Sequence, residues 1–151
     1  PLYRDGLVYV FSGMGSMSAI RPGGKGDVDK THVEWSRRRL VPKKSSPLYL
    51  NGLLYMTSDE GVVSCNDPKT GEILWAERLG GKGQYAASPI HAQGRIYFSS
   101  SEGNFPVLEA GKEFKVLARN KLDAGCMASP AVVGNALVIR TKTHVYRFGK
   151  N

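Results

Sequence analysis

The sequence predicts an all-β fold: a β-propeller of four-stranded antiparallel blades, with about three and a half blades in 151 residues. A pattern recurs about every 40 residues, and its apolar runs are short, rich in Val, Ile, Leu and Tyr, and separated by Gly, Asn, Ser and Asp. Four short strands per unit of this length are typical of a propeller blade. No segment keeps a 3.6-residue apolar period over about 11 positions, so no long helix is expected.

The repeat is clearest at four prolines. Each is followed five residues later by Gly or Asn, the residues that best tolerate positive φ, and three are followed by Tyr eight residues later. The positions are Pro1, Gly6 and Tyr9; Pro47, Gly52 and Tyr55; Pro89, Gly94 and Tyr97; and Pro130, Asn135 and Val138. We therefore read residues 1–151 as a single partial propeller domain with units of about 1–45, 46–87, 88–128 and 129–151.

Each unit divides into strands at its turn residues. The second unit predicts strands at 47–50, 53–57, 61–66 and 72–77, with a strong turn signal at 66–71. The first unit has an enlarged turn over 19–28, after which a strand is expected to resume at 31–35. The fourth unit stops after about two strands. Trp35 and Trp75, near the ends of their units, are expected to pack between blades.

Residues 67–75 carry a family resemblance. Asp67, Thr70, Gly71 and Trp75 resemble the D-x-x-T-G-x-x-x-W signature of quinoprotein-like (PQQ-like) propeller repeats, and residues 88–97 are similar to the innermost-strand pattern of that family. The enlarged turn of the first unit resembles an insert in planctomycete-type, BamB-like members. In the third unit, residues 109–117 replace the signature and its Trp is absent. The resemblance implies a periplasmic or envelope-associated location and a role in protein binding.

Positive charge is concentrated in one segment. Lys and Arg number 21 against 13 Asp and Glu, giving a formal net charge of +8. Five of these cations form a candidate surface for an anionic partner: Arg37, Arg38, Arg39, Lys43 and Lys44. The alternative is a solvated loop between blades. Nucleic acid is not an expected partner, because no aromatic residues alternate with the cations to stack on bases.

The sequence indicates no catalytic, cofactor-binding or metal-binding residues. Its glycine-rich stretches, 23–27 and 80–83, lack the P-loop spacing, and its histidines lack metal-ligand spacing. Its cysteines lie in different units with no spacing signal, so free thiols are favoured over the alternative, a disulfide in a periplasmic protein. Its two acids nearest the signature read as turn residues. The residues concerned are His32, His91, His144, Cys65, Cys126, Asp27 and Asp67.

Two functions follow from these observations. The first is a non-catalytic scaffold that binds protein, with no cofactor. The alternative is a fragment of a PQQ-dependent alcohol dehydrogenase, which would need PQQ and calcium, partly held by residues outside this chain. The chain resembles the C-terminal piece of a longer propeller, so missing blades or a second copy are expected to complete the ring. It has neither an apolar run long enough to span a membrane nor a signal peptide.

Overall fold

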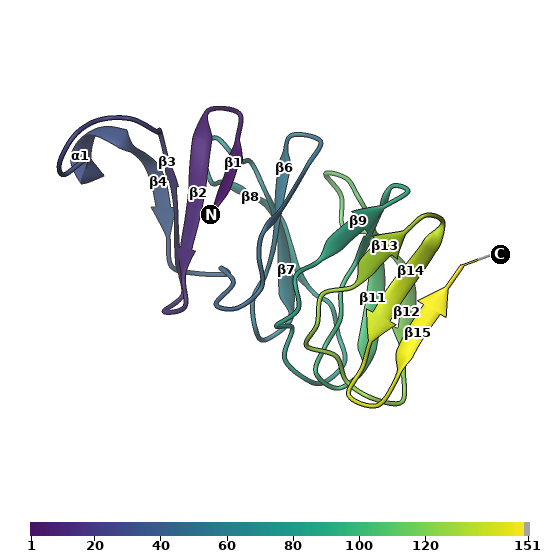
Figure 1. The fold of residues 1–151 in the computed structure, drawn as a ribbon. Helices are drawn as coiled ribbons and strands as arrows, with labels where there is room; N and C mark the ends of the chain where they lie inside the picture. Colours follow the sequence, from purple (N-terminus) through teal and green to yellow (C-terminus); the bar gives the residue numbers. More distant parts are fainter. Residues whose placement is uncertain (150–151) are drawn as a thin grey trace.

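The computed structural model describes residues 1–149 and is built almost wholly of β-strands. Four small antiparallel sheets, here called blades 1 to 4, stand side by side in sequence order (Figure 1). Blade 1 holds β1 (Leu2–Arg4), β2 (Leu7–Ser12), β3 (Ser16–Ile20) and β4 (Val33–Arg37), with the short helix α1 (Asp29–His32) before β4. Blade 2 holds β5 (Leu48–Leu50), β6 (Leu53–Thr57), β7 (Val62–Asn66) and β8 (Ile73–Arg78). Blade 3 holds β9 (Ile90–Ala92), β10 (Arg95–Tyr97), β11 (Asn104–Glu109) and β12 (Val116–Lys121), and blade 4 holds β13 (Ala131–Val133), β14 (Ala136–Arg140) and β15 (Val145–Phe148).

Every blade is a simple meander, in which each strand pairs with the next one along the chain. The first hairpin of blades 1 to 3 has positive φ at two successive residues, as a type I′ turn requires, and in blade 2 these are Asn51 (φ 51°) and Gly52 (φ 72°). The positive φ expected at Gly6, Gly52 and Gly94 is therefore confirmed. In blade 4 the residue with positive φ is Gly134 (φ 56°) and not Asn135, because that turn has its glycine one position earlier.

Two details of the predicted elements were wrong. Thr31 and His32 belong to α1, and the outer strand of blade 1 begins only at Val33, since the backbone N–H groups of both residues bond to the Val28 carbonyl in a helical turn. Blade 4 has three strands and not two, because β13 and β14 are separate strands joined by a tight turn. The four strands of blade 2 match the prediction to within one residue at each end.

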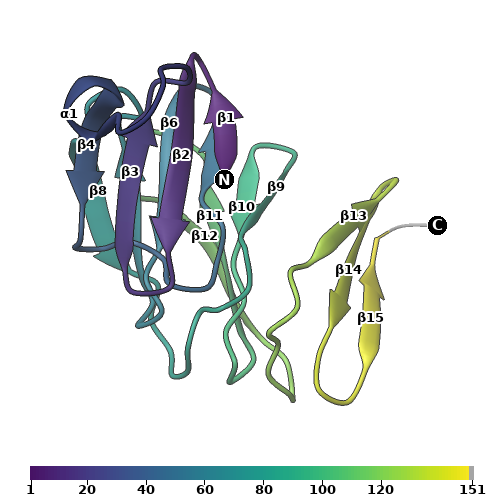
Figure 2. The ribbon, with the colours of Figure 1, turned by 60° about the vertical axis from the view of Figure 1, so that its left-hand side comes forward.

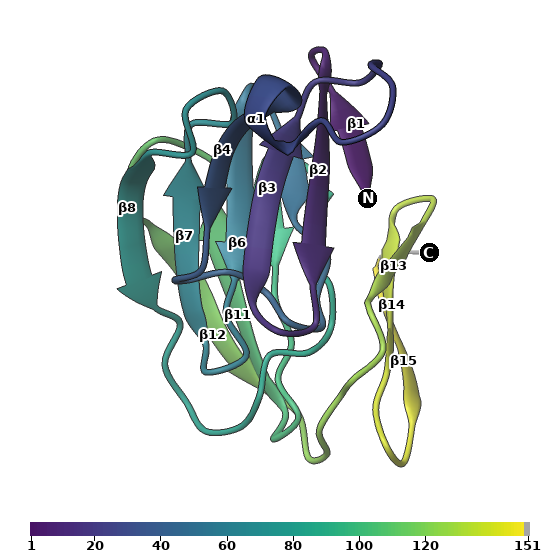
Figure 3. The ribbon, with the colours of Figure 1, turned by 90° about the vertical axis from the view of Figure 1, so that its left-hand side faces the viewer.

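The hydrophobic core lies between the blades, because neighbouring sheets bury their facing surfaces against each other. One cluster, which includes Tyr9, Met17 and Leu54, fills the space between blades 1 and 2, and another, which includes Tyr55 and Ile96, fills that between blades 2 and 3. The cluster between blades 3 and 4 is much smaller, with Phe105, Cys126 and Ile139 as its buried members. Figures 2 and 3 show blade 4 at the end of the row, apart from the three closely stacked sheets.

Candidate functional site

Blades 1 and 2 are joined through the turn between the two outer strands of blade 2. The Tyr9 hydroxyl and the Trp35 indole N–H both donate to the carbonyl oxygen of Pro68, at 3.1 and 2.9 Å. The Trp35 ring also lies against Gly71, where an added Cβ would come within 2.6 Å of the indole. We call this arrangement, in which a Tyr and a Trp of one blade hold the outer turn of the next, a turn contact.

The same turn contact joins blades 2 and 3. The Tyr55 hydroxyl donates to the Gly111 carbonyl at 3.1 Å and accepts the Gly111 N–H at 2.8 Å, while the Trp75 indole N–H lies 3.4 Å from that carbonyl. The Trp75 ring meets Phe114 edge-on, with ring centroids 5.3 Å apart. Both tryptophans therefore pack between blades as expected.

The interface between blades 3 and 4 lacks this contact. Tyr97 occupies the position of Tyr9 and Tyr55, since it pairs with Val107 as Tyr55 pairs with Cys65. Ala118, paired with Val107, stands where blade 2 has Trp75. Among the described residues, the Tyr97 hydroxyl has no hydrogen-bond partner. Within residues 1–149, the third interface therefore keeps the tyrosine but has no indole at the position of Trp75 and no turn that the Tyr97 hydroxyl contacts.

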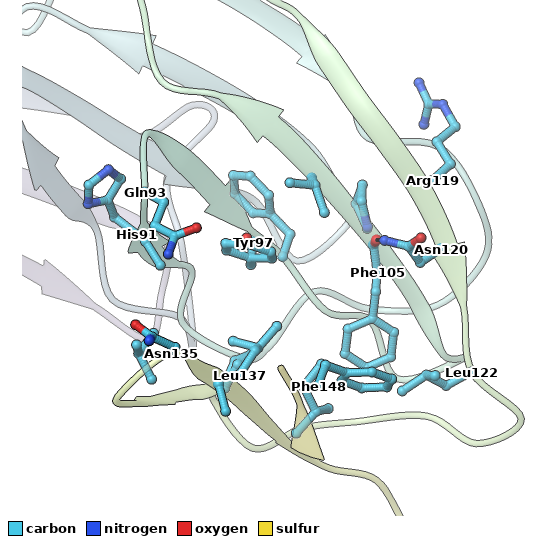
Figure 4. Close-up of a pocket in the computed structure, with 18 of the residues that line it drawn as sticks. His91, Gln93, Tyr97, Phe105, Arg119, Asn120, Leu122, Asn135, Leu137 and Phe148 are labelled. Carbon is cyan, nitrogen blue, oxygen red and sulfur yellow. Dashed lines mark hydrogen bonds between the residues drawn. The ribbon is translucent and has the colours of Figure 1, made fainter. Parts of the chain in front are cut away.

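A cavity of about 910 Å³ opens at this third interface. Figure 4 shows its wall, with Tyr97 and Phe105 of blade 3 facing Leu137 and Phe148 of blade 4. Among residues 1–149 its lining is mainly apolar and includes no acidic residue; polar groups come from His91, Gln93, Arg119, Asn120, Lys121 and Asn135. Apolar walls with a few polar groups are typical of a binding site. This cavity was not predicted from the sequence, because its lining residues are spread from His91 to Phe148 over two blades.

Arg37 does not lie in a solvated loop with the other cations of its segment. It is the last residue of β4 and is half-buried, and its guanidinium donates to the Gly71 carbonyl and to Asn66 Oδ1 of blade 2, both at 2.9 Å. Burial lowers the pKa of Arg37. Its charge is therefore used to join blades 1 and 2.

The other four cations of the segment differ in whether their side chains have hydrogen-bond or ion-pair partners. Lys44 lies 3.5 Å from Asp59 Oδ2 and donates to Gln84 at 3.0 Å. Arg38 and Arg39 are exposed, and within residues 1–149 neither has a hydrogen-bond or ion-pair partner. Lys43 is also exposed. The part of the segment open to a partner is therefore Arg38, Arg39 and Lys43, which we call the basic surface.

The remaining candidates have local structural contacts. His91 Nε2 accepts the Gly94 N–H at 3.1 Å, His32 contacts Thr31, and His144 lies beside Thr143 and Asp123. In the described part of the chain, no three His, Cys, Asp or Glu side chains are placed to hold a metal ion. Cys65 and Cys126 are buried free thiols, and burial raises the pKa of Cys65 to about 11.

The acids near the signature do not fit a bound quinone and its calcium ion. Asp67 accepts the backbone N–H groups of Lys69 and Thr70, at 2.7 and 3.0 Å, and these bonds lower its pKa. Asp27 accepts the N–H of Asp29 at 3.0 Å. Both carboxylates thus stabilise turns, whereas a calcium ion requires several oxygen ligands directed at one point.

Comparison with solved structures identifies the same fold in proteins of low sequence identity. BamB from Moraxella catarrhalis aligns with a TM-score of 0.75 and 15% identity, over 97% of this chain and 43% of that one. The computationally designed Ika4 protein aligns with a TM-score of 0.75 and 12% identity, over 99% of this chain and 88% of that one. The quinohemoprotein alcohol dehydrogenase ADHIIG from Pseudomonas putida HK5 aligns with a TM-score of 0.70 and 14% identity, over 92% of this chain and 27% of that one. This chain thus spans less than half of BamB and of the dehydrogenase.

At these identities the structural likeness shows the fold alone, and no curated protein matches the chain. Within residues 1–149 there is no helix of the length and apolar character needed to cross a membrane. The family is shown by a sequence model described as "Outer membrane protein assembly factor BamB", which matches residues 30–144. Because this match covers well over half of the chain, the protein belongs to that BamB-like family of PQQ-like β-propeller repeat proteins.

Proposed function

We propose that this chain is a non-catalytic propeller module that binds protein in the bacterial cell envelope. The observation that supports this most directly is the match of residues 30–144 to the BamB family model. Fold alone does not determine function, so the binding role must come from particular surfaces. The basic surface, Arg38, Arg39 and Lys43, is exposed and suits an acidic segment of a partner protein.

The geometry supports a binding role for this surface more than a structural one. Arg38 and Arg39 are free of partners among the described residues, whereas the neighbouring Arg37 and Lys44 are held by hydrogen bonds to blade 2 or the loop that follows it. An unpaired exposed cation contributes little to folding, so its loss should affect association and not stability. Charge on a surface of this kind mainly raises the association rate and selects partners.

Fluorescence anisotropy with a labelled glutamate-rich peptide tests the basic surface. Arg38→Glu with Arg39→Glu should weaken binding about tenfold, because two attractions become repulsions. Lys25→Glu with Lys30→Glu is the matched control: it changes the net charge by the same amount on exposed residues near α1. If both double variants weaken binding equally, a localised surface is rejected and only an effect of net charge remains. If neither double variant weakens binding, the basic surface does not bind the peptide.

The alternative function, part of a PQQ-dependent alcohol dehydrogenase, draws support from the fold shared with ADHIIG over 92% of this chain. The discriminating experiment adds PQQ and calcium to the purified chain and follows both quinone absorbance and dye-linked oxidation of an alcohol. Saturable uptake with turnover would overturn the scaffold proposal. Uptake of neither component, together with binding of the acidic peptide at the basic surface, would support the scaffold.

A further inference from the structure

We propose that the glycine-rich loop 80–83, together with Arg119 and Lys121 of β12, binds a phosphate group at the interface between blades 2 and 3. Each of these blades is a complete four-stranded sheet, so both sides of the site belong to the described part of the chain. The residues are distinct from those of the basic surface. A phosphate site here would be a second binding function, beyond the proposed scaffold role.

The loop makes the connection between blades 2 and 3 longer than its two counterparts. In each of the first three blades, an outer-strand residue of the same register and the next inner-strand proline mark the ends of this connection. The pairs are Trp35 and Pro47, Trp75 and Pro89, and Ala118 and Pro130. The members of the second pair lie 14 positions apart, and those of the other two pairs 12. Joining two blades therefore does not require the extra residues, and loops that exceed what a fold needs are where binding residues concentrate.

The hydrogen bonds of the loop use its acceptors and leave its donors available. Asn104 Nδ2 donates to the Lys82 carbonyl at 2.6 Å, and the Tyr85 hydroxyl donates to the Gly80 carbonyl at 2.9 Å. Within residues 1–149, the backbone N–H groups of the loop have no hydrogen-bond partner. Blade 3 and the segment after the loop thus hold its backbone in place, while its N–H groups remain open to a ligand.

The backbone conformation of the loop suits an anion. Gly81 and Gly83 have positive φ, 76° and 98°, whereas Lys82 between them does not. Successive residues that alternate in this way form a concavity of backbone N–H groups that binds anions. Glycine adopts positive φ without strain, which explains the residue types at both positions. The loop leads into a connection to β9 and not into a helix, so the expected ligand is a phosphate group and not a nucleotide held by a P-loop.

A pocket of about 120 Å³ lies against the loop. Gly80 and Gly81 line it from blade 2, and Asn104, Arg119 and Lys121 line it from blade 3. Pockets for drug-sized ligands have volumes of about 300–1,000 Å³, so this smaller one suits a group of only a few atoms. Arginine and lysine beside backbone N–H groups are the donors that phosphate oxygens bind most strongly.

The charges around the pocket also favour an anion. Lys82 and Lys121 are exposed, and in the described part of the chain neither side chain has a hydrogen-bond or ion-pair partner. The Arg119 guanidinium donates through Nη1 to the Leu79 carbonyl, which fixes it beside the loop and leaves its other N–H groups to a ligand. Glu102 lies against the end of the loop but does not line the pocket. Three cations beside one carboxylate give the site a net positive charge.

Two-dimensional NMR of the intact 151-residue chain tests the site, with inorganic phosphate as the probe. The amide resonances of residues 80–83 should shift saturably, with a dissociation constant of about 1–10 mM, because the site offers a few charge-assisted hydrogen bonds to a small ion. Sodium chloride at the same ionic strength is the control and should shift these resonances without saturation. Absence of a saturable shift, or an equal response to chloride, would overturn the inference.

Variants of four lysines separate a local site from an effect of net charge. Lys82→Gln with Lys121→Gln should weaken phosphate binding roughly tenfold, because two charged contacts are lost. Lys69→Gln with Lys112→Gln is the matched control: it removes the same charge from exposed residues at the outer turns, the opposite ends of blades 2 and 3. Both double variants should keep the urea midpoint, since exposed lysines contribute little to folding. Equal weakening by the two, or weakening by neither, would overturn the inference.

Vesicles distinguish the two sources of a phosphate group, a free ion and a lipid headgroup. If the chain sediments with vesicles of phosphatidylcholine and phosphatidic acid, and Lys82→Gln with Lys121→Gln abolishes this, the occupant is the terminal phosphate of the lipid. If phosphate binds but sedimentation is absent or insensitive to the variant, the occupant is the free ion. Failure of both probes would reject the site, whereas the glutamate-rich peptide would still test the scaffold proposal through Arg38 and Arg39.

Discussion

Replacement of Trp75 by Ala tests whether the packing between blades stabilises the chain. Trp75 is half-buried, contacts Tyr55 and Phe114 at ring-centroid distances of 6.2 and 5.3 Å, and directs its N–H at the Gly111 carbonyl. Deletion of a buried Trp costs about 3–5 kcal/mol, and an aromatic pair adds about 0.5–1.5 kcal/mol beyond its buried area. Because part of the ring is exposed and its hydrogen bond is long, we expect a loss of about 3 kcal/mol.

Urea denaturation followed by far-ultraviolet circular dichroism measures this loss, provided that the slope of the transition is unchanged. Leu74→Ala is the control: it removes an adjacent apolar side chain that is 42% exposed, and should cost less than about 1 kcal/mol. A loss below about 0.5 kcal/mol for Trp75→Ala, or one equal to that of Leu74→Ala, would refute the reasoning. The indole would then be a surface group and not part of the contact between blades 2 and 3.

The remaining predictions concern a turn and a buried phenol. Gly52→Ala should lower the free energy of unfolding by about 1–3 kcal/mol, because its positive φ strains any residue with a Cβ. Gly71→Ala should cost at least about 1 kcal/mol more, because Gly71 also has positive φ and an added Cβ there would come within 2.6 Å of the Trp35 ring. The urea midpoints of the two variants measure the difference. The pKa of Tyr55 is raised from 10.0 to about 12, chiefly by burial, so the folded state keeps the phenol protonated where the unfolded chain ionises. This contribution to the free energy of unfolding is complete below pH 10 and is lost between pH 10 and 12. Tyr55→Phe should make the free energy of unfolding fall less steeply over this pH range. An unchanged pH dependence in the variant would assign the loss to other groups.

The blade architecture was predictable because it depends on short-range patterns. Pro47, Gly52 and Tyr55 fix a hairpin through one turn and two strands, and the register follows from the turn. The residues at 66–71 likewise determine the outer turn locally, through the Asp67 side chain. The short helix α1 was missed because four residues are too few to show a helical period.

The position of Arg37 was also predictable in principle. Side chains two residues apart on a strand share a face, and Trp35, which was expected to pack between blades, is two residues before Arg37. Arg37 was instead grouped with Arg38 and Arg39 by charge alone. Charge predicts the chemistry of a surface, whereas the period of the strand predicts which charged residues belong to it.

The cavity was not predictable in the same way, because its lining comes from strands of two blades that lie far apart in the sequence. The loss of Trp from the third unit was visible in the sequence, but Ala118, which stands at its position, is not among the residues that line the cavity. In a repeat array each unit is stabilised by its neighbours, so the blade with the smallest shared core is the one held least firmly. Within residues 1–149, blade 4 shares with blade 3 the small cluster around Phe105, Cys126 and Ile139.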